Sequence, residues 1–322
     1  MFDRESRYEF LAHVASLYYD QNKNQQEIAD EIGVTRSAVS RLLTEARKRG
    51  IVEIMIHYAW RTATDLEKEL ANTFPLQHIR VLARQNMSYD QMLNGLGVLA
   101  AQYFSSILPS LKVVGLTWGT GLYQMVRAFR PQLRPDMEVV QLIGGTGTEL
   151  GSAVGPLLAP NLANSLTCTC RYLHAPLFMA NEAARDALLN DRTIQDTLKR
   201  AESCDIALVG IGSITPQLYN PYRLGYLTQE ELEQMQADGI VGDVACLHYN
   251  IHGEIQEDYW INQRKVGIST PTLKKIKTVL AVAGDSQKAE GIYGALRGGH
   301  IQVLITDDTA ASRVLELYKQ YS

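Results

Sequence analysis

The stretch NQQEIADEIGVTRSAVSRLLTEARKRG, residues 24–50, predicts two short helices joined by a tight turn. Asn24 can cap the first helix, and Glu27, three residues later, can reach back to the free backbone N–H. Gly33 supplies the left-handed backbone that the turn needs, and Thr35 can cap the second helix. This pattern is typical of a helix-turn-helix, which places its second helix in the major groove of DNA.

The second helix has an apolar stripe that includes Val39 and Leu43, and Leu11 and Val14 upstream mark a third helix that would close the core. Its other face carries short polar side chains and arginines, which suit phosphates and base edges. The residues that we expect to contact DNA are Gln25, Thr35, Arg36, Ser37, Ser40, Arg41 and Thr44.

Charge supports this expectation. Residues 35–50 hold five basic side chains and one acid, Glu45, whereas the whole chain has a net charge of −4. A basic stripe on an acidic chain indicates a dedicated DNA-facing surface. The alternative is a solvated helical bundle with no role in DNA binding.

Residues 51–57, IVEIMIH, alternate and are rich in β-branched side chains, which predicts a strand. It could be half of a small wing that touches the DNA backbone. It could equally be a strand that only covers the bundle.

The length of 322 residues and the hydrophobic fraction of 46% suit a small module followed by one large α/β domain. We expect the helix-turn-helix domain at residues 1–57 and the large domain at residues 58–322. No apolar run is long enough to span a bilayer, and the N-terminus has no secretory pattern. The four cysteines lack CxxC spacing, which favours free thiols in a reducing cytoplasm over a zinc site. We therefore expect no metal and no cofactor.

The large domain alternates helical and strand patterns, which predicts a Rossmann-like, doubly wound parallel sheet. The expected helices include residues 91–108 and 120–129, and the expected strands are residues 78–82, 112–118, 138–143, 167–173, 206–211, 278–283 and 303–306.

Glycine or Thr/Asp-rich loops follow five of these strands, including WGTG, GGTGT and GDS. Ligands of such sheets bind at the carboxyl ends of the strands, and glycines let backbone N–H groups approach an anion. These loops predict a pocket for a small anion or sugar phosphate, although such turns also favour glycine for steric reasons alone. None matches a Walker or dinucleotide motif. Asp307 and Asp308 are expected to cap the last helix.

Several segments together resemble the SorC-type sugar-responsive transcriptional regulators, over nearly the whole chain. They are LYYDQNKNQQEIADEIGVTRSAVSRLLTEARKRGIVEI, VVGLTWGTGL, VVQLIGGTGT, DIALVGIGS, GIVGDVACLHYNIHGEI and AVAGDSQKAEGIYGALRGGHIQVLITDDTAA. The resemblance implies a double-stranded DNA operator beside carbohydrate-use genes and a homo-oligomer, expected to be a tetramer. It also implies a sugar-phosphate-isomerase-like domain that senses a small carbohydrate effector, expected to be phosphorylated.

By motif position, the resemblance implies that Gly144, Gly145, Thr146 and Gly147 form the phosphate-facing loop. It implies further effector contacts at Arg171, Asn181, Asp243 and Lys288. Family members commonly have an acid where this chain has Asn250, which leaves the exact ligand open.

Each of these side chains has a physical rationale and an ordinary alternative. A carboxylate such as Asp243 accepts hydrogen bonds from vicinal hydroxyls, but it could also serve a turn. Lys288 could bind a phosphate or be a solvated helix residue. Arg171 lies within an expected strand, where an unpaired charge is costly, so either a ligand or an internal acid should pair with it.

The sequence leaves three functional hypotheses. The first is a transcription factor whose DNA affinity an effector controls. The second is a sugar-phosphate isomerase-like or aldolase-like enzyme with an added DNA-binding module, for which Lys288 and Asp243 could supply the positioned base or the Schiff-base lysine. The third is a structural DNA-binding protein with no effector.

Overall fold

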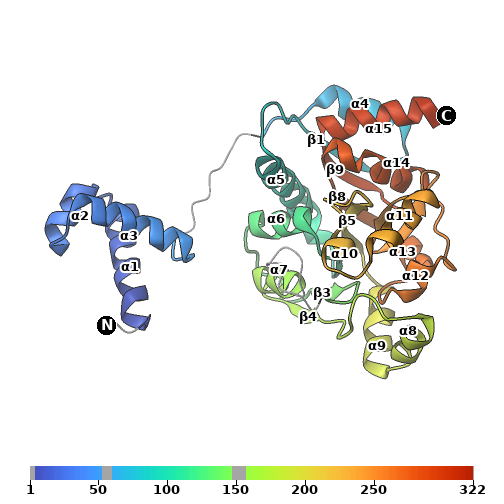
Figure 1. Ribbon diagram of the computed structural model, residues 1–322, viewed down its shortest axis with the longest axis horizontal. Helices are drawn as coiled ribbons and strands as arrows, with labels where there is room; N and C mark the ends of the chain where they lie inside the picture. Colours follow the sequence, from blue (N-terminus) through green and yellow to red (C-terminus); the bar gives the residue numbers. More distant parts are fainter. Residues whose placement is uncertain (1–3, 53–59, 147–156, 322) are drawn as a thin grey trace. The chain divides into compact units, whose positions relative to one another are not determined.

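The computed structural model describes residues 4–52, 60–146 and 157–321 (Figure 1). The chain divides into two compact units, Met1–Ala59 and Trp60–Ser322. Of the expected strand at residues 51–57, only residues 51 and 52 lie in the described part, and they are not in a strand. Gly147 also lies outside the described residues.

The first unit contains helices α1 (Arg4–Tyr19), α2 (Gln25–Ile32) and α3 (Arg36–Lys48). The predicted capping box is present, because Asn24 Oδ1 accepts from the backbone N–H of Glu27 at 3.0 Å and Glu27 Oε2 accepts from that of Asn24 at 2.8 Å. Gly33 ends α2 at a φ of 69°, and Thr35 caps α3 through the N–H of Ala38. The three helices enclose an apolar core of Leu11, Val14, Ala15, Leu17, Ile28, Ala29, Val39, Leu42, Leu43 and Ala46.

The second unit is built on a parallel sheet in the order β1-β9-β8-β5-β2-β3-β4. Its strands are β1 (His78–Leu82), β2 (Val113–Leu116), β3 (Glu138–Gln141), β4 (Thr169–Arg171), β5 (Ile206–Ser213), β8 (Thr278–Val282) and β9 (Val303–Asp307). A hairpin of β6 (Ile240–Val244) and β7 (Leu247–Asn250) pairs antiparallel with the end of β5. The central strands are nearly continuous apolar runs because helices cover both faces.

Figure 1 shows α5, α6 and α7 on one side of the sheet and α14 and α15 on the other. The helices of this unit are α4 (Thr64–Thr73), α5 (Tyr89–Ile107), α6 (Thr120–Ala128), α7 (Leu158–Leu166), α8 (Glu182–Leu189), α9 (Arg192–Ala201), α10 (Asn220–Arg223), α11 (Gln229–Ala237), α12 (Trp260–Arg264), α13 (Thr270–Lys275), α14 (Ala289–Arg297) and α15 (Asp308–Tyr321). Short 3-10 turns are η1 (Leu108–Ser110) and η2 (Ser286–Lys288). Of the two expected caps of the last helix, Asp307 is confirmed, since its Oδ1 accepts from the N–H groups of Thr309 and Ala310. Asp308 is instead the first residue of α15, and its Oδ2 accepts from the N–H of Arg84.

The direction of winding reverses between β2 and β5. From β2 the chain moves outward to β3 and β4, then returns to β5 on the opposite side of β2 and moves outward to β8 and β9. The carboxyl ends of β2 and β5 are therefore the topological switch point, which is where open α/β sheets bind ligands.

Candidate functional site

A pocket of about 570 Å³, a volume that includes its opening to solvent, lies at this switch point. Its wall comes from the loop after β2, the end of β5, the β6–β7 turn, the segment before α10, and η2. The lining residues are Thr117, Trp118, Gly119, Thr120, Gly121, Ile143, Gly210, Ile211, Gly212, Leu218, Tyr219, Asn220, Pro221, Asp243, Ala245, Cys246, Val282 and Lys288.

The loop after β2 brings the N-terminus of α6 to the pocket. Gly119 has φ 154° and ψ 162°, a backbone conformation that is essentially restricted to glycine. A Cβ at Gly121 would lie 3.0 Å from the carbonyl oxygen of Val282, so the glycine allows a tight approach of the first turn of α6 to β8. Because the first N–H groups of a helix have no intrahelical acceptor, this end of the pocket suits an anion.

Asp243 is almost fully buried beside the pocket, on β6. Its Oδ2 accepts from the backbone N–H of Cys246 at 3.0 Å. It pairs across the ladder with Gly212, and a Cβ on Gly212 would lie 1.8 Å from its Oδ1. Glycine at position 212 is therefore what makes room for the carboxylate.

Lys288 brings a cation to the same pocket from η2. Its Nζ donates to the carbonyl oxygen of Ile211 at 3.0 Å and makes no ion pair with a residue that the structure describes. Burial lowers the pKa of this amine, while Asp243 and Asp285 act in the opposite direction. An ammonium has three N–H donors, so Lys288 can bind a ligand anion without losing its contact with Ile211.

The turn between β6 and β7 is strained. Ala245 and Cys246 have φ values of 52° and 56°, where the common two-residue hairpin turn favours glycine or asparagine. The hydrogen bond from Cys246 to Asp243 helps to hold this conformation. Residues 244–247, VACL, contain none of the residues typical of a turn, so the sequence did not predict the hairpin. Of the hairpin residues that line the pocket, only Asp243 was predicted.

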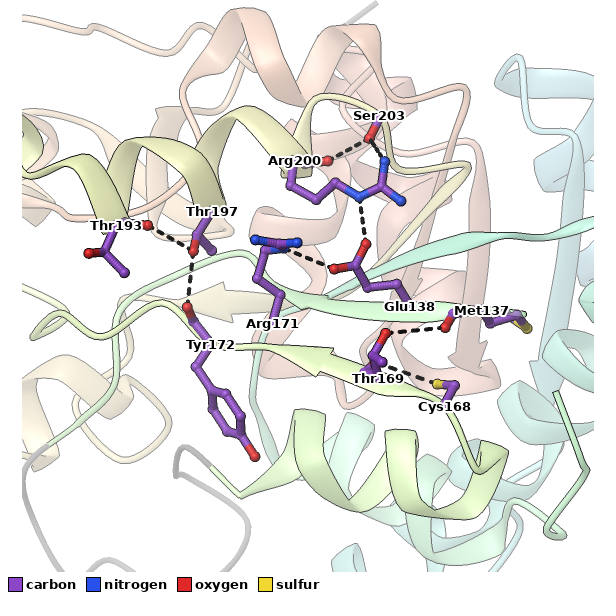
Figure 2. A network of polar contacts seen from close by, with 10 residues as sticks. All are labelled: Met137, Glu138, Cys168, Thr169, Arg171, Tyr172, Thr193, Thr197, Arg200 and Ser203. Atoms are coloured by element: carbon purple, nitrogen blue, oxygen red, sulfur yellow. Dashed lines mark hydrogen bonds and ion pairs between the residues drawn. The ribbon is translucent and has the colours of Figure 1, made fainter. Parts of the chain in front are cut away.

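Two of the expected effector residues, Asp243 and Lys288, meet in the pocket, and Arg171 does not line it. Figure 2 shows Arg171 on β4 with its guanidinium directed at Glu138, the first residue of β3. The Nε atoms of Arg171 and Arg200 lie 2.9 and 2.5 Å from the two carboxylate oxygens of Glu138. Burial alone would raise the pKa of Glu138, but the two arginines outweigh it and lower the pKa. An internal acid, the second option for Arg171, thus pairs with its charge.

Asn181 also lies away from the pocket. It is exposed and caps α8, where its Oδ1 accepts from the N–H of Ala184 at 2.9 Å.

Two backbone N–H groups of the expected phosphate loop already donate to carbonyl oxygens within the protein. The N–H groups of Gly144 and Gly145 donate to the carbonyls of Val266 and Ala175, each at 2.9 Å. A Cβ on Gly144 would lie 2.3 Å from the carbonyl oxygen of Pro176, so this glycine serves close backbone packing. Thr146 is buried and does not line the pocket. The anion-binding role therefore fits residues 118–121, at the start of α6, better than residues 144 and 145.

Knowledge of the strand order would have identified the loop at residues 117–121 as the one beside the pocket. Both loops are rich in glycine, but the 117–121 loop follows β2, which lies at the switch point. Tyr219, which no motif marked, also belongs to the wall.

In the first unit, the predicted DNA-contacting face is available. Arg36, Ser37, Ser40, Arg41 and Thr44 are exposed, as is Thr35, whereas Gln25 is half-buried. Neither arginine forms an ion pair with any described residue. In contrast, Glu45, the one acid of α3, is paired with Arg7 at 2.6 Å and Arg49 at 2.7 Å, and the Arg7 hydrogen bond is the largest cause of its lowered pKa. Its charge is thereby neutralised and the face of α3 is positive.

Within the described ranges, no helix is long and apolar enough to cross a membrane. Three or more potential metal ligands do not gather anywhere in the same residues.

Comparison with known proteins agrees with this architecture. Residues 59–316 match a family model described as a sugar-binding domain, and residues 12–49 match one described as sigma-70, region 4. This chain belongs to the SorC family of sugar-binding transcriptional regulators. It therefore combines a DNA-binding helix-turn-helix with a doubly wound sugar-binding domain.

The relatives match along nearly their whole length. The deoxyribonucleoside regulator of Bacillus subtilis (strain 168) is 28% identical over 96% of this chain and 97% of its own. LsrR, a transcriptional regulator of Escherichia coli O139:H28 (strain E24377A / ETEC), is 29% identical over 95% and 94%. The crystal structure of the full-length sorbitol operon regulator SorC from Klebsiella pneumoniae aligns with a TM-score of 0.72 at 27% identity, covering 96% of this chain and 99% of that one.

Proposed function

We propose that this regulator binds an operator through the exposed face of α3 and that a phosphorylated sugar or polyol in the switch-point pocket controls its DNA affinity. The observation that carries the proposal is the convergence of Asp243, Lys288 and the N-terminus of α6 on one pocket. A carboxylate accepts hydrogen bonds from hydroxyls, and an ammonium beside a helix N-terminus binds a phosphate.

The relatives support a proposal for the genes that this protein regulates. One of them is named a sorbitol operon regulator and another a deoxyribonucleoside regulator, which supports carbohydrate-use genes as the targets. We propose a cytoplasmic homo-oligomer, with a tetramer as the first arrangement to test, and a domain boundary near residues 57 and 58. An effector that binds one conformation more tightly would shift the population towards or away from the DNA-binding form.

One observation favours the enzyme alternative. Lys288 has a lowered pKa and lies near Asp243 in a pocket, which are properties that a catalytic acid or base also needs. We propose that the pair binds a ligand without transforming it. NMR of each bound compound after long incubation with the protein tests this point, and conversion above the rate without protein would support the enzyme.

A ligand screen tests the proposal as a whole. The full chain and the variants Lys288→Met and Asp243→Asn are heated with phosphorylated and free sugars and polyols. We expect one class of phosphorylated compound to raise the melting temperature of the wild type in a saturable way, because a ligand that binds only the folded state stabilises it. Both variants should lose that rise. If every compound leaves the wild type unchanged, a DNA-binding protein without an effector becomes the better account.

A further inference from the structure

Tyr219, in the wall of the pocket, begins a buried chain of hydrogen bonds. Its hydroxyl lies 2.6 Å from Nε2 of His248, and Nδ1 of His248 lies 2.9 Å from Oδ1 of Asn262. The three residues are 1%, 0% and 6% exposed, so these hydrogen bonds are sheltered from bulk solvent. No sequence motif predicted this series of hydrogen bonds.

The partners of Asn262 determine which atom donates and which accepts in each of these hydrogen bonds. Its Nδ2 faces two carbonyl oxygens, those of His248 at 3.2 Å and Gln256 at 2.8 Å, so Nδ2 donates and Oδ1 accepts. Oδ1 also accepts from the backbone N–H of His248 at 2.9 Å. The Nδ1 of His248 must therefore carry a proton.

Burial lowers the pKa of His248, so the ring is neutral and its Nε2 has no proton. The Tyr219 hydroxyl consequently donates its one proton inward to Nε2. Burial, with Asp243 and Cys246 adding to it, raises the pKa of Tyr219 well above its usual range, so this proton is retained. The Tyr219 oxygen can therefore take part in a further hydrogen bond only as an acceptor.

The pocket thus contains two chemically distinct kinds of group. Lys288 and the first turn of α6 carry hydrogen-bond donors, whereas the lining residues Asp243 and Tyr219 carry side-chain oxygens that can accept. A phosphate dianion has acceptors alone, so it can bind the donors and is repelled by the acceptors. A hydroxyl group of the ligand is what can donate to Asp243 and Tyr219.

We propose that Tyr219, held by His248 and Asn262, accepts a hydrogen bond from a ligand hydroxyl and so selects a sugar or polyol with one phosphate over its bisphosphate. This inference rests on the proposed function and specifies the ligand class of the same pocket.

The test is calorimetric titration of the full chain and its Tyr219→Phe variant. The probes are inorganic phosphate, glucose 6-phosphate, fructose 6-phosphate, ribose 5-phosphate, 2-deoxyribose 5-phosphate, and the 1,6-bisphosphates of glucose and fructose. Tyr222→Phe, in the neighbouring helix α10 and outside the pocket lining, is the matched control.

For any monophosphate that binds the wild type, we expect Tyr219→Phe to weaken binding about fivefold, the usual effect of one neutral hydrogen bond. Inorganic phosphate should bind both proteins equally, since it contacts the donor groups alone. Tyr222→Phe should behave as the wild type, and a bisphosphate should bind at least tenfold more weakly than the monophosphate of the same sugar. A merely structural role of Tyr219 would instead weaken inorganic phosphate and monophosphate alike.

The outcomes separate the inference from the function on which it rests. A monophosphate that binds wild type and Tyr219→Phe equally, or a bisphosphate that binds as tightly as the monophosphate, overturns the inference and leaves the proposed function intact. If no phosphorylated compound binds the wild type, both are overturned.

Discussion

Lys265 carries a buried charge that no acid among the described residues pairs with. It is 5% exposed, and its Nζ donates to the backbone carbonyl of Ile268. Burial lowers its pKa from 10.5 to about 8, although Cys246 and Asp243 act in the opposite direction. At a pH between these values the unfolded chain binds more protons than the folded one, so stability must rise with pH.

We predict that the wild type gains stability relative to Lys265→Met as the pH rises from 7 to 10.5. The pKa change corresponds to a gain of about 3 kcal/mol, most of it above pH 8. Denaturant unfolding of both proteins across this range measures the difference. Lys274→Met, which changes an exposed lysine, is the matched control, and a profile for Lys265→Met that is flat across this pH range would contradict the prediction.

Two glycines at the end of β5 provide a second test at the level of single residues. A Cβ on Gly212 would collide with Asp243, whereas a Cβ on Gly210 would have no atom within 4 Å. We expect Gly212→Ala to lower the free energy of unfolding by about 1–3 kcal/mol, as overpacked sites do, and Gly210→Ala to lower it much less. Equal effects of the two substitutions on urea unfolding would mean that Asp243 does not occupy its described position.

At the scale of elements, α3 should carry the affinity for DNA. Arg41→Ala should weaken binding to DNA and reduce the salt dependence of log Kd by about one, if the side chain contacts a phosphate. Fluorescence anisotropy with the full chain at several salt concentrations measures both quantities. Arg192→Ala removes an exposed arginine of α9 in the other unit and should change neither, and equal losses for both variants would argue against a DNA-binding role for α3.

Elements with local signals were predictable from the sequence. The caps at Asn24 and Thr35 and the strand β1 follow from residues within a few positions of one another. The β6–β7 hairpin was not predictable, because its turn at Ala245 and Cys246 contains no residue that favours a positive φ.

The candidate site could be predicted only in part for a similar reason. Asp243 and Lys288 follow from motif position and do line the pocket. The partner of Arg171 does not follow from the sequence, since Glu138 lies 33 positions away and only the pairing of β3 with β4 brings the two together. The order of strands, which decides which glycine-rich loop lies at the switch point, is likewise a property of the assembled sheet.

At the scale of the whole molecule, control by an effector requires that the binding free energies of DNA and effector depend on each other. If an effector changes the affinity for DNA by some factor, DNA must change the affinity for the effector by the same factor. This reciprocity separates true coupling from two independent binding activities on one chain.

The most direct test measures the Kd of the full chain for an operator that the protein itself has selected from random DNA, with and without a saturating phosphorylated sugar from the ligand screen. We predict a change of at least tenfold for the wild type, a matching change in sugar affinity when DNA is present, and neither change for Lys288→Met. A sugar that saturates the pocket and leaves the Kd for DNA unaltered would contradict the account.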